Sequence, residues 1–297
     1  MSALDTLRFV ARHPLNRPHP LHALARMAAW QLGSRLLPGD LVFGWLQGAL
    51  LLVKPGRTGL TGNVYRALQE YSEMAYLLHV LRPGNLFVDV GANLGSYTVL
   101  AAAVVGADVI CIEPVPETFA QLEQNVRINR VDQRTQCVNA GVGRERGFMQ
   151  FSTGLGPGNH VVALACGSPD DSVTLPITTL DLLMAGRRTS LIKIDVEGFE
   201  TAVIAVVAEV LAEPSLHSVI MELNGSGGAY DFDEASLLTT MHGHGFCPHA
   251  YDPLTRTLRR LDTADPALEN CIFIRDLALA AARVRAARHY RVHGSEL

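Results

Sequence analysis

The amino-acid sequence predicts an α/β protein built on a mostly parallel, Rossmann-like sheet. Three observations support this fold class. A short apolar run at residues 87–90 meets a glycine turn at residues 91–95 and continues into a helix pattern. Strand and helix patterns then alternate along the chain, which indicates parallel strands joined by crossovers. The expected strands end in acidic or amide residues, where open α/β sheets bind their ligands.

Length and composition narrow the class of protein. The chain has 297 residues, of which 48% are hydrophobic and 18% charged, enough for a large core and unlike a disordered chain. The formal net charge of −4, without a Lys/Arg block, argues against a general nucleic-acid partner. Five cysteines without a C-x-x-C motif predict reduced thiols in a cytoplasmic protein and no metal site.

The first 81 residues predict a mainly helical N-terminal extension. Two apolar stripes at helical spacing fall within residues 1–40, separated by Pro14, Pro18 and Pro20. Residues 41–53 predict a short β-hairpin, with a helix as the alternative. This apolar run is too short to span a bilayer and no signal-peptide order precedes it, so we expect no stable membrane insertion. Residues 64–81 predict one amphipathic helix.

Residues 82–297 predict the Rossmann-like domain, which includes a C-terminal helix at residues 276–292. The expected parallel strands are residues 86–90, 108–113, 135–139, 190–195 and 217–223, with 245–251 and 270–275 as an antiparallel edge. The helices that alternate with them include residues 95–105, 116–129, 179–184 and 233–242. Two further strand patterns, 148–152 and 173–177, predict an inserted β-arm around a glycine-rich loop at 154–160, a segment suited to covering a site.

The glycine turn has the pattern D-x-G-A-N-x-G, formed by Asp89, Gly91, Asn93 and Gly95, with Ser96 beginning the helix. A dinucleotide site has G-x-G-x-x-G and directs its helix at a pyrophosphate. The carboxylate of Asp89 suits an ammonium or hydroxyl better than a phosphate. These residues therefore favour S-adenosylmethionine, which has an amino group and ribose hydroxyls but no phosphate. A purely structural glycine turn is the alternative.

Three other strand ends carry candidate binding residues. Glu113 follows the glycine loop by about twenty residues, the offset at which a carboxylate accepts hydrogen bonds from both ribose hydroxyls. Its alternative is a solvated residue before Pro114. Asn139 is a candidate contact to the adenine or its ribose, and Asp195 ends the fourth strand beside the glycine turn.

Three motifs together closely resemble the FkbM family of S-adenosylmethionine-dependent methyltransferases. They are residues 89–98, the Glu113-Pro114 pair and residues 192–200, and the resemblance extends over about residues 58–275. It implies a class I, seven-stranded Rossmann-like fold with S-adenosylmethionine as the cofactor. It further implies O-methylation of a hydroxyl on a small molecule such as a sugar, glycoside or polyketide-type natural product.

Methyl transfer requires alignment of donor and acceptor, and the acceptor's proton must leave. Asp195 is the first candidate to orient or deprotonate the acceptor, and Glu197 is the second, although either carboxylate could instead cap the following helix. His160 in the glycine-rich loop is a third candidate base, with a simply solvated histidine as its alternative. We expect a homodimer as one option for assembly.

Lys193 alternates with Asp195 on a strand that should be central. A buried ammonium needs an anionic partner, and Asp89 or Glu222 on the neighbouring strands would serve. We therefore interpret Lys193 as structural.

Two other functions fit the same glycine turn. One is a cofactor-binding relative that acts on a macromolecule or lacks catalysis. The other is an NAD-type oxidoreductase, which the loop pattern disfavours.

Overall fold

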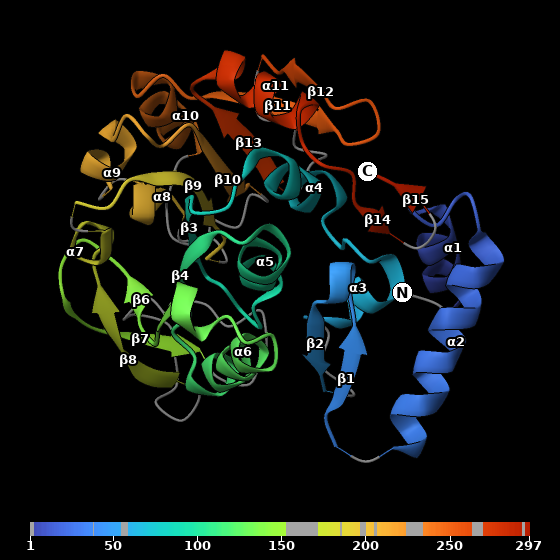
Figure 1. The fold of residues 1–297 in the computed structure, drawn as a ribbon. Helices are drawn as coiled ribbons and strands as arrows, with labels where there is room; N and C mark the ends of the chain where they lie inside the picture. The colour runs from blue at the N-terminus through green and yellow to red at the C-terminus, as the bar shows by residue number, and fades with distance from the viewer. Residues whose placement is uncertain are drawn as a thin grey trace.

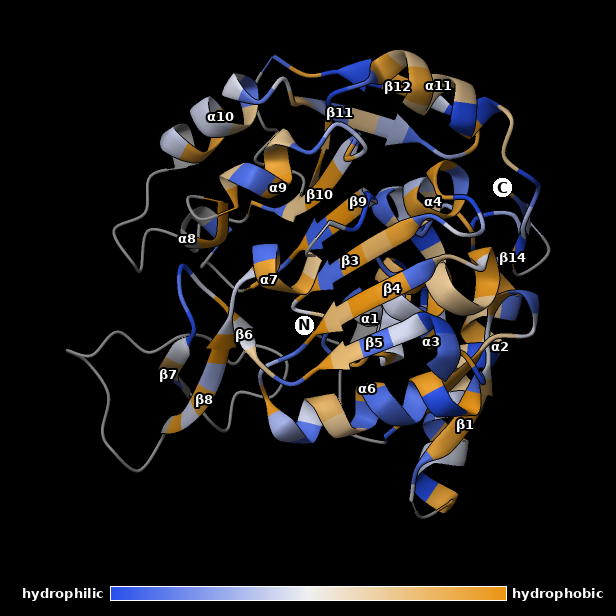
Figure 2. Cartoon of the chain, turned by 60° about the vertical axis from the view of Figure 1, so that its left-hand side comes forward, coloured by the Kyte–Doolittle hydropathy of each residue, from blue (hydrophilic) through white to orange (hydrophobic). Residues whose placement is uncertain are grey.

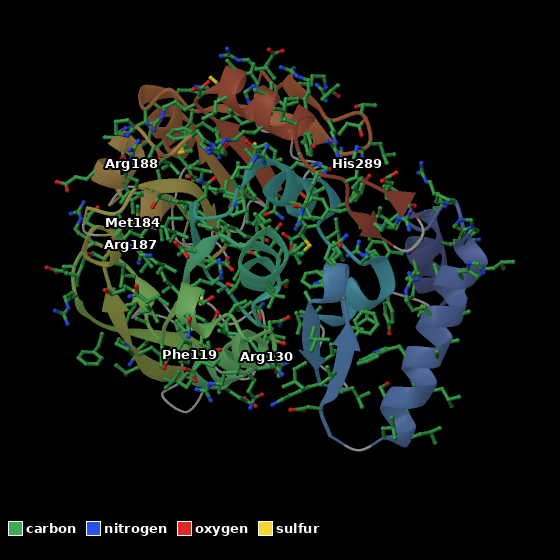
Figure 3. All side chains as sticks on the ribbon, in the orientation of Figure 1. Phe119, Arg130, Met184, Arg187, Arg188 and His289 are labelled. Carbon is green, nitrogen blue, oxygen red and sulfur yellow. The ribbon has the colours of Figure 1, made fainter. Side chains whose placement is uncertain are left out.

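The computed structural model describes residues 3–37, 39–54, 59–152, 172–184, 186–196, 200–204, 207–223, 234–262, 270–292 and 295–297. A central sheet has helices on both of its faces, and the N-terminal helices lie to one side of it (Figure 1). Side chains fill the space between the sheet and these helices (Figure 3). None of the described helices is long and apolar enough to cross a bilayer.

The central sheet has eight strands in the order β12-β11-β13-β10-β9-β3-β4-β5. Five of them are parallel: β3 (Leu86–Val90), β4 (Asp108–Ile112), β5 (Thr135–Val138), β9 (Thr189–Ile194) and β10 (Ser218–Glu222). The antiparallel edge consists of β13 (Asn270–Ile274), β11 (Cys247–Asp252) and β12 (Thr257–Arg260). The predicted α/β class and mostly parallel sheet are confirmed, and β12 adds an eighth strand to the seven expected.

The central strands are apolar because helices cover both faces of the sheet. Every residue of β3 and β9 is buried, and the apolar strands are visible in Figure 2. On one face lie α4 (Tyr71–Val80), α5 (Ser96–Val99), its π-helical continuation η2 (Leu100–Val105), α6 (Pro116–Ile128) and α11 (Leu277–Arg285). On the other lie α8 (Glu200–Ile204), α9 (Ala208–Ala212) and α10 (Glu234–Gly243). Two separate apolar clusters form the core on these two faces.

The predicted β-arm is confirmed. Strand β7 (Gly147–Ser152) pairs antiparallel with β8 (Ser172–Thr178), and β6 (Gly141–Val142) runs parallel to β8. The short helix α7 (Leu180–Met184) follows, and Thr179 Oγ1 accepts a hydrogen bond from the Leu182 amide, as expected for a cap. The glycine-rich loop 154–160, including His160, lies outside the described residues.

The N-terminal segment contains α1 (Ala3–Arg12), α2 (Pro20–Leu36) and a hairpin of β1 (Leu41–Gly44) and β2 (Leu50–Val53), joined by the 3-10 turn η1 (Leu46–Gly48). The hairpin prediction is therefore correct. The single helix predicted for residues 64–81 is wrong, because α3 (Thr61–Arg66) ends at Ala67, whose φ of 67° is left-handed. Only α4, after that break, packs along the sheet. The boundary between an extension and the main domain at residue 81 stays a prediction.

The C-terminal helix is also shorter than predicted. Helix α11 ends at Arg285, and a two-stranded ribbon follows, formed by β14 (Arg291–Val292) and β15 (Ser295–Glu296). Asp276 caps α11 by accepting a hydrogen bond from the Leu279 amide at 2.9 Å. The 3-10 turn η3 (Asp132–Arg134) leads into β5.

Candidate functional site

The ends of five parallel strands place the predicted binding residues at one edge of the sheet. Because β3, β4, β5, β9 and β10 share one direction, their carboxyl ends meet at that edge. The glycine loop follows β3, Glu113 follows β4, Asn139 follows β5 and Asp195 follows β9. The sequence prediction that these residues come together is confirmed by the topology.

The glycine loop turns through left-handed backbone conformations. Gly91, Asn93 and Gly95 have φ values of 76°, 51° and 89°. The amides of Gly91 and Ala92 both donate to the Ile112 carbonyl, at 3.0 and 2.9 Å, which holds the loop against the end of β4.

Gly91 is required by a contact inside the chain. A Cβ on Gly91 would lie 1.8 Å from the backbone carbonyl oxygen of Asp195, far closer than any side chain allows. From the sequence alone, this glycine is expected to admit the donor. The structure instead provides a sufficient reason in the packing of β3 against the end of β9.

Gly95 connects the loop to α5. It stands at the N-cap, and its added Cβ would lie 2.6 Å from Leu122 Cδ1 on α6. Ser96 begins the helix and is half-buried. Glycine at this position therefore lets α5 and α6 approach each other closely.

Glu113 joins the glycine loop to the loop that follows β4. Its Oε2 accepts a hydrogen bond from the Asn93 amide at 3.0 Å, and its Oε1 accepts one from the Val115 amide at 2.9 Å. The side chain of Asn139 donates to the Glu113 and Pro114 carbonyls, both at 2.9 Å. Glu113, which is predicted to bind the ribose, therefore also holds the glycine loop in place.

The electrostatics of Glu113 follow from its burial. The residue is 6% exposed. Burial raises the pKa of its carboxyl to about 7, against the lowering effect of the two amide donors, while Asp89 and Asp195 raise it further. Each carboxylate oxygen has two lone pairs, so both oxygens keep acceptor capacity beyond the amide they already engage. The arrangement fits a ligand that offers a pair of hydroxyl donors.

Asp89 lies inside the chain, below the loop. It is 1% exposed, and its Oδ2 accepts a hydrogen bond from Thr98 Oγ1 at 2.7 Å, which ties β3 to α5. Burial raises the pKa of Asp89 to about 6, although Lys193 and Thr98 lower it. A direct contact of Asp89 with the donor stays a prediction.

Lys193 forms an ion pair with Asp195. Its Nζ lies 2.6 Å from Asp195 Oδ2, and the two side chains are 4% and 25% exposed. Burial lowers the pKa of Lys193, but Asp195, Glu70 and Asp89 outweigh that effect and the net shift is upward. Asp89 is thus one of the charges that keep Lys193 protonated, as predicted for one of its two candidate anionic partners, and Asp195 is a further partner that the sequence did not predict. Lys193 reaches a residue two positions along its own chain because Asp195 lies just past the end of β9.

A polar group that the sequence did not single out surrounds this ion pair. Lys193 Nζ lies 4.7 Å from the centre of the Tyr97 ring. Tyr97 Oη donates to Glu70 Oε2 at 2.6 Å, and Asn270 Nδ2 donates to the same oxygen at 3.2 Å. Glu70 precedes α4 and Asn270 begins β13, so 200 residues separate them. No local signal could have connected them.

Three carboxylates at this edge lie close together. One oxygen each from Asp195, Glu200 and Glu222 falls within 4.8 Å of the others. Glu200 Oε1 accepts a hydrogen bond from the Val196 amide at 2.9 Å and so closes the turn before α8. Carboxylate oxygens are ligands that hard cations prefer. The sequence predicts no metal site, and that expectation stays a prediction.

The remaining predicted catalytic residues, Glu197 and His160, lie outside the described residues. Asp195 is therefore the one of the three whose surroundings the structure describes. Its carboxylate is held by Lys193 and lies beside the glycine loop, a position that suits orientation of an acceptor.

Known proteins resemble this chain over the region that contains the candidate site. The family model described as "Methyltransferase FkbM domain" matches residues 89–246. The "31-O-demethyl-FK506 methyltransferase FkbM" of Streptomyces tacrolimicus is 30% identical over 225 residues, which cover 64% of this chain and 84% of that protein.

Solved structures resemble the chain more distantly. M. jannaschii TYW2 in complex with AdoMet has a TM-score of 0.40 and 12% identity, over 81% of this chain and 90% of that one. A TehB-like SAM-dependent methyltransferase from Corynebacterium glutamicum has a TM-score of 0.40 and 11% identity, over 87% and 100% of the two chains.

Proposed function

Because this chain belongs to the FkbM methyltransferase family, we propose that it uses S-adenosylmethionine to methylate a hydroxyl oxygen of a small molecule. The acceptor class is a sugar, glycoside or polyketide-type natural product. The observation that carries the proposal is Glu113, a buried carboxylate fastened to the glycine loop with acceptor capacity left at both oxygens. The name of the relative from Streptomyces tacrolimicus, a methyltransferase of a 31-O-demethyl compound, supports oxygen as the methyl acceptor.

The residues at the strand ends fit the donor. Glu113 would accept hydrogen bonds from the ribose hydroxyls, and Asn139 would contact the adenine or its ribose. The loop residues Gly91, Asn93 and Gly95, together with Ser96, would border the rest of the donor. Asp89 supports the loop from below through Thr98. When bound, S-adenosylmethionine supplies a methyl carbon that is activated by its sulfonium.

Asp195 is our candidate for the residue that orients or deprotonates the methyl acceptor. Its Oδ2 is engaged by Lys193, but the side chain is 25% exposed and so keeps a surface toward an acceptor. Lys193 holds the Asp195 carboxylate in place at 2.6 Å, which positions it to accept a hydrogen bond from the acceptor hydroxyl and align it. Removal of the hydroxyl proton falls to Asp195 or, as the other candidates, to Glu197 or His160.

The proposal is tested by incubating the protein with methyl-labelled donor and a panel of glycosides and polyketides, then measuring mass. The expected result is a product heavier by one labelled methyl group, formed on oxygen. A Glu113→Ala variant serves as the control, because weaker donor binding should slow the transfer at limiting donor concentration. Binding is measured separately by calorimetry with S-adenosylhomocysteine and with NADH. Binding of NADH instead of S-adenosylhomocysteine would refute the cofactor, and methyl transfer only to macromolecules would refute the acceptor class.

A further inference from the structure

The outer face of α2 is apolar. Its exposed residues include Leu21, Ala25, Ala28, Ala29, Leu32 and Leu36. Their spacing of three and four residues places them on one side of the helix. The three leucines are 79%, 62% and 69% exposed. Helices of soluble proteins turn such a stripe toward the core, but the leucines of this one are exposed, and α2 lies at the edge of the molecule (Figure 1).

Polar contacts fix α2 in that orientation. Arg26 on the inner side donates through Nη2 to Asn16 Oδ1 at 3.0 Å and to the Tyr65 carbonyl at 2.9 Å. Its Nε donates to the Val64 carbonyl at 3.1 Å, and Gln31 bonds to the Tyr65 hydroxyl. Rotating the helix to bury its leucines would break all of these bonds. The outward position of the stripe is therefore built into the packing of α2 on α3.

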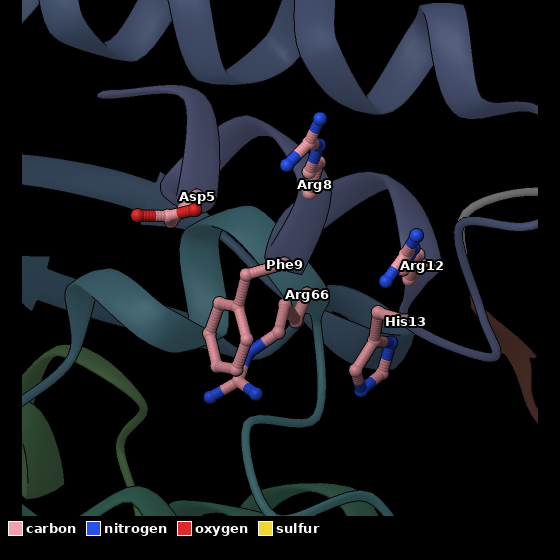
Figure 4. A pocket seen from close by; sticks show the side chains of 6 residues that line it. All are labelled: Asp5, Arg8, Phe9, Arg12, His13 and Arg66. Carbon is pink, nitrogen blue, oxygen red and sulfur yellow. The ribbon is translucent and has the colours of Figure 1, made fainter. Parts of the chain in front are cut away.

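The surroundings of this stripe are basic. Residues 1–37 contain one acidic residue and five arginines, of which only Arg26 is turned inward, although the whole chain has a net charge of −4. Helix α2 contains no acidic residue, and the exposed Arg17 and Arg35 lie near its two ends. On the adjacent α1, Arg8 and Arg12 line a cavity of about 510 Å³ together with Arg66 from α3, and Asp5 is the one acidic residue that lines it (Figure 4). Exposed apolar area and positive charge thus occur on the same pair of helices.

We propose that the outer face of α2 docks on an anionic membrane surface. The helix lies in the interface, with its leucines among the lipid chains and the arginines at its ends near lipid phosphates. Its 17 residues measure about 26 Å, and it lies along the membrane and does not cross it. The positive charge of α2 favours an anionic membrane over a second copy of the chain as the partner of this face. An antiparallel pair of α2 helices would bring Arg35 of one copy toward Arg17 of the other, with no acidic residue in either helix to compensate.

The test is co-sedimentation of the full-length protein with vesicles of phosphatidylcholine alone or mixed with phosphatidylglycerol. We expect binding to the anionic vesicles only, and weaker binding at high salt. The double substitution Leu21→Ser and Leu32→Ser should lower the partition coefficient by about tenfold or more, since two inserted leucine side chains are lost. The control is Leu254→Ser, at a leucine that is 61% exposed in the turn between β11 and β12. It should bind as the unmodified protein does.

Three outcomes would overturn the proposal. One is unmodified protein that stays in the supernatant with anionic vesicles. Another is equal partitioning of the double variant and the unmodified protein. The third is a dimer, detected by light scattering, that the double substitution dissociates without any vesicle binding by the unmodified protein, because a second copy would then cover the face. Circular dichroism confirms that the variants are folded, and their leucines are exposed, so loss of the fold is not expected.

Discussion

Glu113 should make donor binding depend on pH, because its two protonation states differ in what they can accept. In the protein without bound donor, burial raises the pKa of the Glu113 carboxyl to about 7. The ionised form can accept hydrogen bonds from ribose hydroxyls at both oxygens, whereas the protonated form turns one oxygen into a donor. Donor binding therefore selects the ionised form. Lowering the pH through 7 is the perturbation.

The size of the effect follows from that pKa. At pH 6 about nine-tenths of the free protein is protonated at Glu113, so binding should release about 0.9 proton. Affinity for S-adenosylhomocysteine should fall by about fivefold between pH 7 and 6 and by roughly tenfold, about 1.4 kcal/mol, for each further pH unit, and should stay constant above about pH 8.

The assay is isothermal titration calorimetry with S-adenosylhomocysteine between pH 5.5 and 8.5, as an experimental range of about three units around the pKa. Each pH is measured in two buffers of different ionisation enthalpy, so that the difference in heat counts the protons released. Glu113→Gln removes the titrating group and should abolish the release. Asp89→Asn is the matched control, because the pKa of Asp89 is also raised by burial, to about 6. This variant should retain the release, centred at a lower pH, because the charge of Asp89 helps to raise the pKa of Glu113.

Two results would refute the reasoning. A dissociation constant that does not change from pH 6 to 8, with no proton release, would show that Glu113 does not accept hydrogen bonds from the ribose hydroxyls. Proton release that persists in Glu113→Gln and disappears in Asp89→Asn would show that Asp89, and not Glu113, is the group that loses a proton on binding.

Gly91→Ala should lower the free energy of unfolding by more than about 2 kcal/mol, because the new Cβ would lie 1.8 Å from the Asp195 carbonyl at a φ of 76°. Urea denaturation measures this, with Gly147→Ala as the control, since nothing lies within 4 Å of that Cβ; equal losses in both variants would contradict the contact. Asp195→Asn should slow single-turnover methyl transfer by about 10²- to 10⁴-fold if it accepts the hydroxyl proton, with nearly unchanged donor affinity. A loss explained by donor binding alone would remove Asp195 from the acceptor side. Tyr97→Phe should cost about 1–3 kcal/mol of stability, because a buried hydroxyl donates to a carboxylate at 2.6 Å; an unchanged denaturation midpoint would count against that bond.

Much of the fold follows from patterns that are local in the sequence. Short apolar runs alternating with helix patterns located the strands of the parallel sheet, and the glycine turn after residue 90 marked the edge that is predicted to bind the ligand. Because parallel strands end at the same edge, the sequence by itself is enough to place Glu113, Asn139 and Asp195 together. The hairpin at residues 41–53 needed the structure, since the periodicity of its apolar runs did not distinguish strand from helix.

The tertiary structure decided which groups face one another. Periodicity identified the apolar stripe of α2 but could not show its direction, which depends on contacts of Arg26 with Asn16 and α3. The partner of Lys193 depends on where the chain turns after β9. Ala67 breaks a helix that its neighbours would continue, because it adopts a left-handed φ that alanine rarely takes.

At the candidate site, too, the sequence determined some features and the tertiary structure decided others. The sequence determined that carboxylates stand at the strand ends, because that depends only on residue type and position along a strand. It could not determine that Glu70 and Asn270 meet at Tyr97, or that Gly91 faces the carbonyl of Asp195. Those contacts join segments far apart in the chain, and they arise only when the register of the sheet and the packing of its helices set the distances in space.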